Sequence, residues 1–141
     1  MQRIVFAVVL SLVALAPARA DVRIISSPGG EVREYLHIFE LLRRSGERIV
    51  IDGPCLSACT LVLSTIPHNR ICVTRRAVLG FHAARWIDRS GRTYSAADET
   101  RMLVATYPDA VQAWIKRRGG LKQRAIFLRG RELAALYPRC S

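Results

Sequence analysis

The chain has 141 residues, with 22 lysines and arginines against 11 aspartates and glutamates and a formal charge of +11. That length is enough for one domain with a modest hydrophobic core. The arginines are spread along the chain without the interleaved aromatic residues that are typical of nucleic-acid-binding modules, so we expect no nucleic-acid partner. A codon bias toward arginine explains the charge more simply than a specific anionic partner such as a membrane surface.

The first twenty residues have the three parts of a secretory signal peptide. A positive start precedes an apolar run over residues 4–16 and a small-residue cleavage site, Ala18-Arg19-Ala20. The apolar run is shorter than the roughly 20 residues that a membrane-spanning helix needs. We therefore predict that residues 1–20 are removed, which leaves one periplasmic or secreted domain of residues 21–141 with a charge of +9, because Arg3 and Arg19 leave with the peptide. The alternative is a membrane anchor formed by residues 4–18.

Four cysteines remain in the predicted domain: Cys55, Cys59, Cys72 and Cys140. In an oxidising compartment an even number of cysteines predicts up to two disulfides, and the sequence leaves all three pairings open. Zinc is a weaker interpretation, because no Cys or His pair with ligand spacing follows the Cys55-x3-Cys59 pair. We expect neither a metal nor a cofactor.

The first half of the domain alternates between strand and helix patterns. Turn residues Ser27-Pro28-Gly29-Gly30 and Gly53-Pro54 separate several of the expected elements. Apolar residues at helical spacing predict an amphipathic helix after the first turn, and a continuous apolar run predicts a buried helix after the second. The expected elements are a strand at 22–26, a helix at 32–45, a strand at 48–52, a helix at 57–66, and strands at 70–74 and 77–83.

The second half is predicted to be mainly helical. A polar, hairpin-like stretch at 88–95 precedes a long helical region, which Ser95 and Asp98 would open as a capping box. Pro108 should interrupt this region and Gly119-Gly120 should end it, before a last short helix at 130–138. The order of elements indicates a single α/β domain with short strands and flanking helices.

Three segments carry residues that suit acyl-transfer chemistry. The backbone amides of the Ser27–Gly30 turn are candidate donors to an oxyanion. Ser57 lies at the start of the buried helix, where it is either an ordinary N-cap or a nucleophile with the amide of Ala58 beside it. His82 ends an apolar strand, where a general base can face a cleft.

Together these segments resemble the ClpP/crotonase superfamily, and in particular exported relatives of the proteolytic subunit of Clp proteases. The resemblance rests on Ser-Pro-Gly-Gly before an amphipathic helix, on Cys-x-Ser-Ala-Cys at residues 55–59 after Gly53, and on an apolar strand that ends in histidine. It covers residues 22–84 well and continues weakly into residues 127–138. It implies a ββα spiral fold, a peptide substrate and a homo-oligomer.

The resemblance also implies roles for individual residues. Ser57 occupies the place of the nucleophile, and His82, 25 residues later, that of the base. Gly30 and Ala58 occupy the places of the residues whose amides stabilise the oxyanion. In an exported chain, Cys55 and Cys59 are then interpreted as half-cystines that fasten the serine turn, with their partners left open, and not as nucleophiles.

The chain departs from the family's pattern at the triad acid, in its length, and at Arg85-Trp86, where the family has a different loop on the substrate side. The family's acidic triad member lies in a run rich in carboxylates, whereas the matching run here, residues 119–127, has none. The candidate substitutes are Asp88, Asp98, Glu99 and Asp109, and their spacing singles out none of them. Almost no chain precedes the Ser-Pro-Gly-Gly turn in the predicted domain, so we expect a truncated spiral with an exposed edge that a partner subunit could cover.

Two hypotheses follow for the function. The first is an exported serine hydrolase, peptidase-like, with Ser57 as nucleophile and His82 as base. The second is a non-catalytic binding or assembly module of the same fold, motivated by the missing acid and the short chain. A weaker third hypothesis is a small disulfide-rich module in which Ser57 only caps a helix.

Overall fold

The computed structural model describes residues 20–141. The alternative anchor at residues 4–18, and all but the last residue of the predicted signal peptide, lie outside this range, so both remain predictions. Among residues 20–141 no helix combines the length and the apolar character needed to cross a membrane.

The described chain is a mixed α/β domain, as predicted from the order of elements. It forms eight short strands, five α-helices and two 3₁₀ helices within residues 20–141. The strands are β1 (Asp21–Ile24), β2 (Arg48–Ile51), β3 (Pro54–Leu56), β4 (Ile71–Val73), β5 (Val78–Phe81), β6 (Arg85–Ile87), β7 (Thr93–Ser95) and β8 (Ile126–Arg129). The helices are α1 (Val32–Ser45), η1 (Ser57–Leu61), α2 (Val62–Thr65), η2 (His68–Arg70), α3 (Ala97–Thr106), α4 (Asp109–Arg117) and α5 (Gly130–Leu136).

Two three-stranded sheets form the centre of the domain. The first has the order β1-β2-β4 and is parallel throughout, and the second has the order β3-β5-β8, with β3 and β5 parallel and β8 antiparallel. Three passes of the chain each contribute to the first sheet and then to the second: β1 with Ser27, which bridges to Cys55, then β2 with β3, and β4 with β5. This arrangement fits an α/β class with short strands, while the ββα spiral itself remains a prediction.

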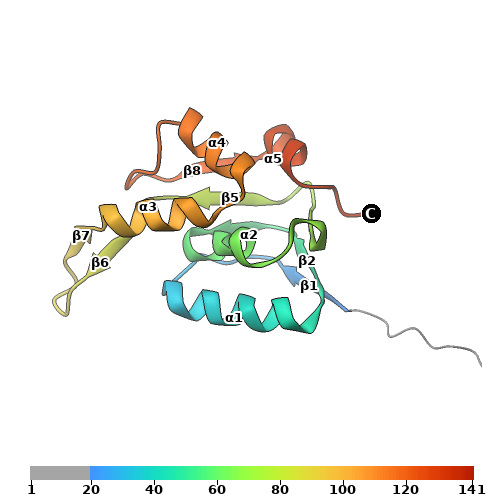
Figure 1. Cartoon of the computed structure of the whole chain (residues 1–141), viewed down its shortest axis with the longest axis horizontal. Coiled ribbons are helices and arrows are strands. Elements are labelled where there is room, and N and C mark those ends of the chain that lie inside the picture. Colours follow the sequence, from blue (N-terminus) through green and yellow to red (C-terminus); the bar gives the residue numbers. More distant parts are fainter. Residues whose placement is uncertain (1–19) are drawn as a thin grey trace, which may run out of the picture.

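Helices lie on two opposite sides of the pair of sheets. Figure 1 shows α1 beside the β1 and β2 strands, and α4 and α5 on the opposite side, near β8. Helix α1 ends at Gly46, whose φ of 81° lies in the left-handed region that favours glycine. The guanidinium of Arg70 then donates hydrogen bonds of 2.8 Å to the carbonyls of Leu42 and Arg43, which would otherwise lack partners at the helix end.

The hydrophobic core joins both sheets to η1, α2 and α4. Its largest fully buried side chains include Ile49, Ile71, Leu79, Phe81 and Ile115. The disulfide between Cys72 and Cys140 ties β4 to the C-terminus, where backbone hydrogen bonds link Val73 to Pro138 and Cys140. The C-terminal residues therefore cover the outer edge of β4, which is one of the ways proteins protect an edge strand.

Several sequence predictions are wrong in detail. The first strand ends at Ile24 and not at residue 26, and the predicted turn at Gly53-Pro54 continues into the strand Pro54–Leu56. The capping box is absent, because Ser95 belongs to β7 and Ala96 is the residue that precedes α3. Strand β8 was not predicted, and it forms only by pairing with β5, which lies far away in the sequence.

Candidate functional site

Ser57 lies at a sharp junction between strand β3 and the 3₁₀ helix η1. Its φ is 55°, the only positive value of a non-glycine residue within residues 20–141. A serine held in this region costs on the order of 1–3 kcal/mol and persists only where the surrounding structure enforces it. Such strained strand-to-helix turns present the nucleophile in serine hydrolases of another fold, where the turn exposes the serine hydroxyl. Leu56 is the N-cap of η1 and Ser57 is its first residue, so the interpretation of Ser57 as an N-cap is wrong and the positive φ needs another explanation.

The Ser-Pro-Gly-Gly turn packs directly against the serine turn. A Cβ placed on Gly29, which has a φ of 83°, would lie 2.5 Å from the Cβ of Ser57 and 3.0 Å from the amide nitrogen of Ala58. Two backbone hydrogen bonds join the turns, from the amide of Ser27 to the carbonyl of Pro54 (2.8 Å) and from the amide of Leu56 to the carbonyl of Ser27 (2.9 Å). Only glycine fits at position 29, and the close contact brings the two predicted segments together.

The disulfide between Cys55 and Cys59 spans the serine turn. Its half-cystines lie in β3 and η1, two residues on either side of Ser57, and both are buried. A covalent link across so short a loop restricts the backbone on both sides of the strained residue. The two disulfides of the structure resolve the pairing that the sequence left open and confirm that the cysteines are structural.

His82 leaves the sheet beside Ser57. Strands β3 and β5 are parallel neighbours with Leu56 opposite Gly80, so Ser57 and His82 follow the same ends of adjacent strands. No hydrogen bond joins the two side chains among the residues that the structure describes. Hydrogen bonds between catalytic groups are often long in ligand-free structures and tighten when substrate binds, so the arrangement remains compatible with a nucleophile and its base.

The imidazole of His82 is oriented by a backbone carbonyl. Its Nδ1 lies 2.8 Å from the carbonyl oxygen of Ala83. Because a carbonyl only accepts hydrogen bonds, Nδ1 carries the proton and the lone pair of the neutral ring lies on Nε2. This is the tautomer that a general base toward serine requires.

No carboxylate of the described chain bonds to His82. Asp88 accepts hydrogen bonds from Ser90, Arg92 and Tyr94 within its own hairpin, and Asp98 pairs with Arg101. Asp88 and Asp98, two of the candidate substitutes for the triad acid, therefore bond to residues other than His82. No hydrogen bond of the described chain joins Glu99 or Asp109 to the imidazole. The carbonyl of Ala83 is the hydrogen-bond partner that His82 has in place of an acid.

The two predicted oxyanion donors differ in their surroundings. Ala58 is buried and its N–H lies in the first turn of η1, where amides lack an acceptor within the helix. Gly30 is exposed, and within residues 20–141 its N–H donates no hydrogen bond. Gly29, which the sequence analysis did not single out, is the glycine that contacts the serine turn.

A pair of buried hydroxyls supports the Ser57 turn from the core side, and no sequence pattern indicates it. Thr60 Oγ1 lies 2.7 Å from the carbonyl oxygen of Ser57 and 2.6 Å from the hydroxyl of Tyr107, at the end of α3. Since Thr60 donates to the carbonyl, Tyr107 donates to Thr60. Burial raises the pKa of Tyr107 to about 12. The Tyr107 ring also packs edge-on against Phe81, the residue before His82, with ring centroids 5.4 Å apart. One side chain thus contacts the supports of both candidate catalytic residues.

A second buried group, Asp52, has a structural role. Its side chain is 4% exposed and accepts hydrogen bonds from Arg76, Thr74 and Arg23. These hydrogen bonds, that of Arg76 first, hold the pKa of the Asp52 carboxyl well below its ordinary value. Each of these hydrogen bonds joins Asp52 to a neighbouring strand or turn of the first sheet, so Asp52 fixes the end of β2. None of them involves His82.

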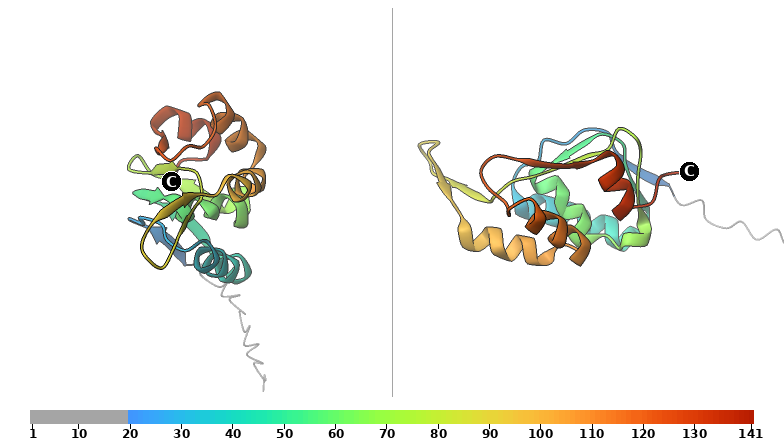
Figure 2. Two further views of the ribbon diagram at one scale, coloured as in Figure 1. Left: turned by 90° about the vertical axis from the view of Figure 1, so that its left-hand side faces the viewer. Right: turned by 90° about the horizontal axis from the view of Figure 1, so that it is seen from above.

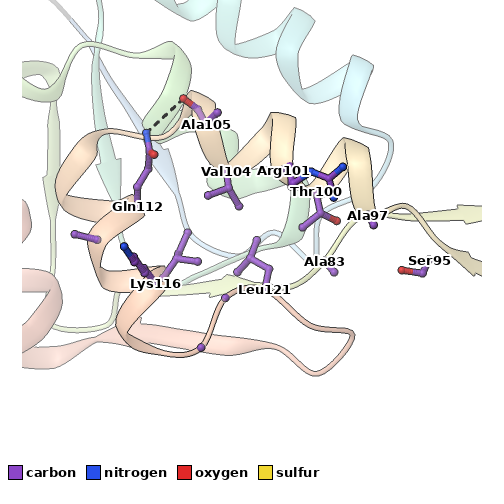
Figure 3. Close-up of a pocket in the computed structure, with 14 residues that line it drawn as sticks. Ala83, Ser95, Ala97, Thr100, Arg101, Val104, Ala105, Gln112, Lys116 and Leu121 are labelled. Carbon is purple, nitrogen blue, oxygen red and sulfur yellow. Dashed lines mark hydrogen bonds between the residues drawn. The ribbon is translucent and has the colours of Figure 1, made fainter.

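A groove lies between α3, α4 and the loop that follows α4. It has a volume of about 730 Å³, and Ala83, the neighbour of His82, forms part of its wall. Figure 3 shows the polar side chains of Thr100, Arg101, Gln112 and Lys116 along it. Ser57 and His82 do not line the groove themselves, so this groove adjoins the candidate site through Ala83 and does not contain it.

No protein-family model matches the chain, and no curated protein matches it. Solved structures do match, and one of them is a mutant of ClpP1 from Listeria monocytogenes. The chain is 10% identical to it, with a TM-score of 0.39, over 82% of this chain and 86% of that chain. A function for the chain therefore has to be argued from the geometry of its own residues.

Proposed function

We propose that the chain is an exported serine hydrolase, peptidase-like, with Ser57 as nucleophile and His82 as general base. The observation that carries the proposal is the backbone of Ser57, which adopts a φ of 55° at a strand-to-helix junction. Glycine at position 29, a disulfide and a buried hydroxyl all converge on this turn. A structural N-cap needs none of these supports, because N-cap residues ordinarily have extended backbone angles.

The proposed reaction uses Ser57 as the nucleophile and His82 as the base. Nε2 of His82 accepts the proton of the Ser57 hydroxyl as Ser57 Oγ attacks the carbonyl carbon of the substrate. The amide of Ala58, at the N-terminus of η1, donates to the oxyanion that forms, and an amide of the Pro28–Gly30 turn is the second candidate donor. The imidazolium then protonates the leaving group, which departs and leaves an acyl group on Ser57. Water attacks this acyl group while His82 accepts its proton, and His82 then returns the proton to Ser57 Oγ as the acid product leaves.

The carbonyl of Ala83 replaces the carboxylate of a triad, and this limits the expected rate of hydrolysis. In triad enzymes the acid both fixes the tautomer of the imidazole and stabilises the imidazolium, and losing the correct tautomer costs about 10⁴ in rate. Here the carbonyl keeps the tautomer but contributes only a dipole to the charged ring. We therefore expect a hydrolase that is slower than a triad enzyme, acting on activated esters more readily than on peptides.

A second candidate function is a non-catalytic binding module. The absence of a carboxylate hydrogen bond to His82 in the described chain favours it. This hypothesis predicts that Ser57→Ala and His82→Ala leave the binding of a partner unchanged, and that neither variant alters any hydrolysis above background.

Hydrolysis of a chromogenic ester by the purified chain distinguishes the two. We expect hydrolysis that Ser57→Ala abolishes and that Ser64→Ala, a serine of the adjoining helix α2, leaves intact. Circular dichroism of each variant shows that the fold is retained. Equal rates for the wild type and Ser57→Ala would remove the catalytic proposal and leave the binding module.

A further inference from the structure

The hairpin of β6 and β7 stands apart from the rest of the domain. Residues 85–95 project beyond the N-terminal end of α3, as Figure 1 and the right-hand view of Figure 2 show. Its two strands pair only with each other. A two-stranded hairpin is marginally stable in water by itself, so this one needs either support from its own side chains or a surface that covers it.

The hairpin exposes large apolar side chains on both faces. Trp86 is 60% exposed, Ile87 63% and Tyr94 47%. Trp86 lies directly opposite Tyr94 across the strands, whereas Ile87 points to the other face. Most large apolar side chains of the domain are buried, whereas this hairpin exposes three within eleven residues.

The charges of the hairpin are predominantly positive. Residues 85–95 contain three arginines and one aspartate, and the aspartate, Asp88, is already bonded to Arg92. Arg85 and Arg89 are exposed and form no ion pair or hydrogen bond within residues 20–141. Bonds from Ser90 and Tyr94 to Asp88 hold the tip in shape and keep the Tyr94 hydroxyl at its polar end.

This combination determines what kind of surface fits the hairpin. A second copy of the hairpin would bring two positively charged projections together, which opposes pairing with itself. Tryptophan and tyrosine have an apolar body with a polar tip, which suits the boundary between headgroups and acyl chains. Unpaired arginines beside them are attracted to anionic headgroups, each by about 1 kcal/mol near the surface.

We propose that the 85–95 hairpin docks on the surface of an anionic membrane, with Trp86, Ile87 and Tyr94 at the headgroup boundary and Arg85 and Arg89 on anionic headgroups. From the sequence we expect contact with a membrane only through residues 4–18, and the hairpin is a second, separate route. Because β6 begins three residues after His82, docking would also hold the candidate site close to the membrane. The proposal stands whether or not Ser57 is catalytic.

The test is co-sedimentation of the chain with vesicles of phosphatidylcholine alone and of equal parts phosphatidylcholine and phosphatidylglycerol. All variants carry the same N-terminus, verified by mass spectrometry, so any effect of the leader cancels. We expect Arg85→Gln with Arg89→Gln to lower the partition coefficient for anionic vesicles on the order of 30-fold. Arg117→Gln with Arg131→Gln, two exposed arginines elsewhere, is the control and should have a much smaller effect.

Fluorescence provides a second readout. The domain has an exposed tryptophan, Trp86, and a buried one, Trp114, which is 2% exposed. Docking predicts a blue shift of the emission on addition of anionic vesicles, and Trp86→Ala should remove the shift and lower the partition coefficient by roughly tenfold. Exposed Leu41→Ala is the matched control on helix α1.

Three results would overturn the proposal. One is binding to anionic vesicles that the hairpin variants leave unchanged. Another is equal binding to neutral vesicles, which would remove the role of the arginines. The third is binding of the hairpin to soluble polyglutamate with no blue shift from vesicles, which would assign the surface to an acidic polypeptide.

Discussion

The hydroxyls of Thr60 and Tyr107 offer the sharpest test of how the fold holds Ser57. Both side chains are buried, with exposed fractions of 1% and 6%. Thr60 donates to the carbonyl of Ser57 and accepts from Tyr107, so the three groups form a single chain of hydrogen bonds. The perturbations are Thr60→Val and Tyr107→Phe, each of which removes a hydroxyl while keeping nearly the same shape.

The two variants should differ in cost. Tyr107→Phe removes one hydrogen bond and keeps the ring against Phe81, so we expect a loss of about 1 kcal/mol in the free energy of unfolding. Thr60→Val leaves the buried Tyr107 hydroxyl without its acceptor and also removes the side-chain hydrogen bond to the Ser57 carbonyl. Since a buried polar group left unpaired costs about 1–3 kcal/mol and the lost hydrogen bond about 1 kcal/mol, we expect a loss of roughly 2–4 kcal/mol.

The double variant tests the chain of bonds itself. Once Thr60 is valine, the buried Tyr107 hydroxyl has no partner and lowers the free energy of unfolding. Adding Tyr107→Phe should therefore cost no further stability or restore some of it. The double variant is therefore expected to fall short of the sum of the two single losses by about 1 kcal/mol or more. The assay is urea unfolding followed by the fluorescence of buried Trp114, with all four proteins measured at one pH. Losses that add within error would refute the hydrogen-bond chain.

The same variants separate stability from support of the serine. Thr60→Val releases the Ser57 carbonyl, whereas Tyr107→Phe leaves the bond from Thr60 to Ser57 in place. Ester hydrolysis measured well below the unfolding midpoint should therefore fall strongly in Thr60→Val and little in Tyr107→Phe. Equal activity in the two variants would show that Thr60 does not hold the serine turn.

Alkaline unfolding gives an independent check on Tyr107. Because burial raises its pKa to about 12, the unfolded state loses the proton first, near its ordinary value of about 10. The stabilisation that this shift represents is present below that value and is lost as the pH rises toward 12. Tyr107→Phe should reduce the alkaline loss of stability, with the part that comes from Tyr137 remaining.

Three further predictions concern other supports of the fold. Replacing both Cys72 and Cys140 by serine opens a cross-link over 68 residues and should lower the free energy of unfolding by about 4 kcal/mol in chemical denaturation; a loss below about 1 kcal/mol would contradict the pairing. The hydrogen bonds to Asp52 lower its pKa, so its stabilising effect is present above about pH 4 and is lost as the pH falls. Asp52→Asn should therefore make the melting temperature less dependent on pH in acid, and an unchanged profile would argue against these hydrogen bonds. Gly29→Ala and Gly91→Ala introduce a Cβ at nearly the same φ, 83° and 82°, but only the first crowds the candidate nucleophile; hydrolysis should be lost in the first alone, and equal activity would contradict the contact.

The sequence predicted most elements because they depend on local patterns. The apolar spacing of residues 32–45 predicts helix α1, and short apolar runs near turn residues predict β2 and β5. Residue spacing and a resemblance together singled out Ser57 and His82, which the structure places after neighbouring parallel strands. These features were predictable because few residues, close in sequence, determine them.

The rest depends on contacts between distant segments. Thr60 and Tyr107 are 47 residues apart, and neither has a pattern that indicates a partner. Strand β8 has no alternation of its own and forms because β5 is available to pair with it. Ser95 matched a capping box in sequence, but pairing with Arg85 in the hairpin took it into β7 instead.

Ser57 is proposed to be a nucleophile that His82 activates. The most direct measurement is the reaction of the folded chain with a fluorophosphonate probe, followed by mass spectrometry of its peptides. We predict an adduct on Ser57 that is absent in Ser57→Ala and strongly reduced in His82→Ala. A folded chain with no adduct on Ser57 from mildly acidic to mildly alkaline pH, or one that reacts equally fast without His82, would contradict the account.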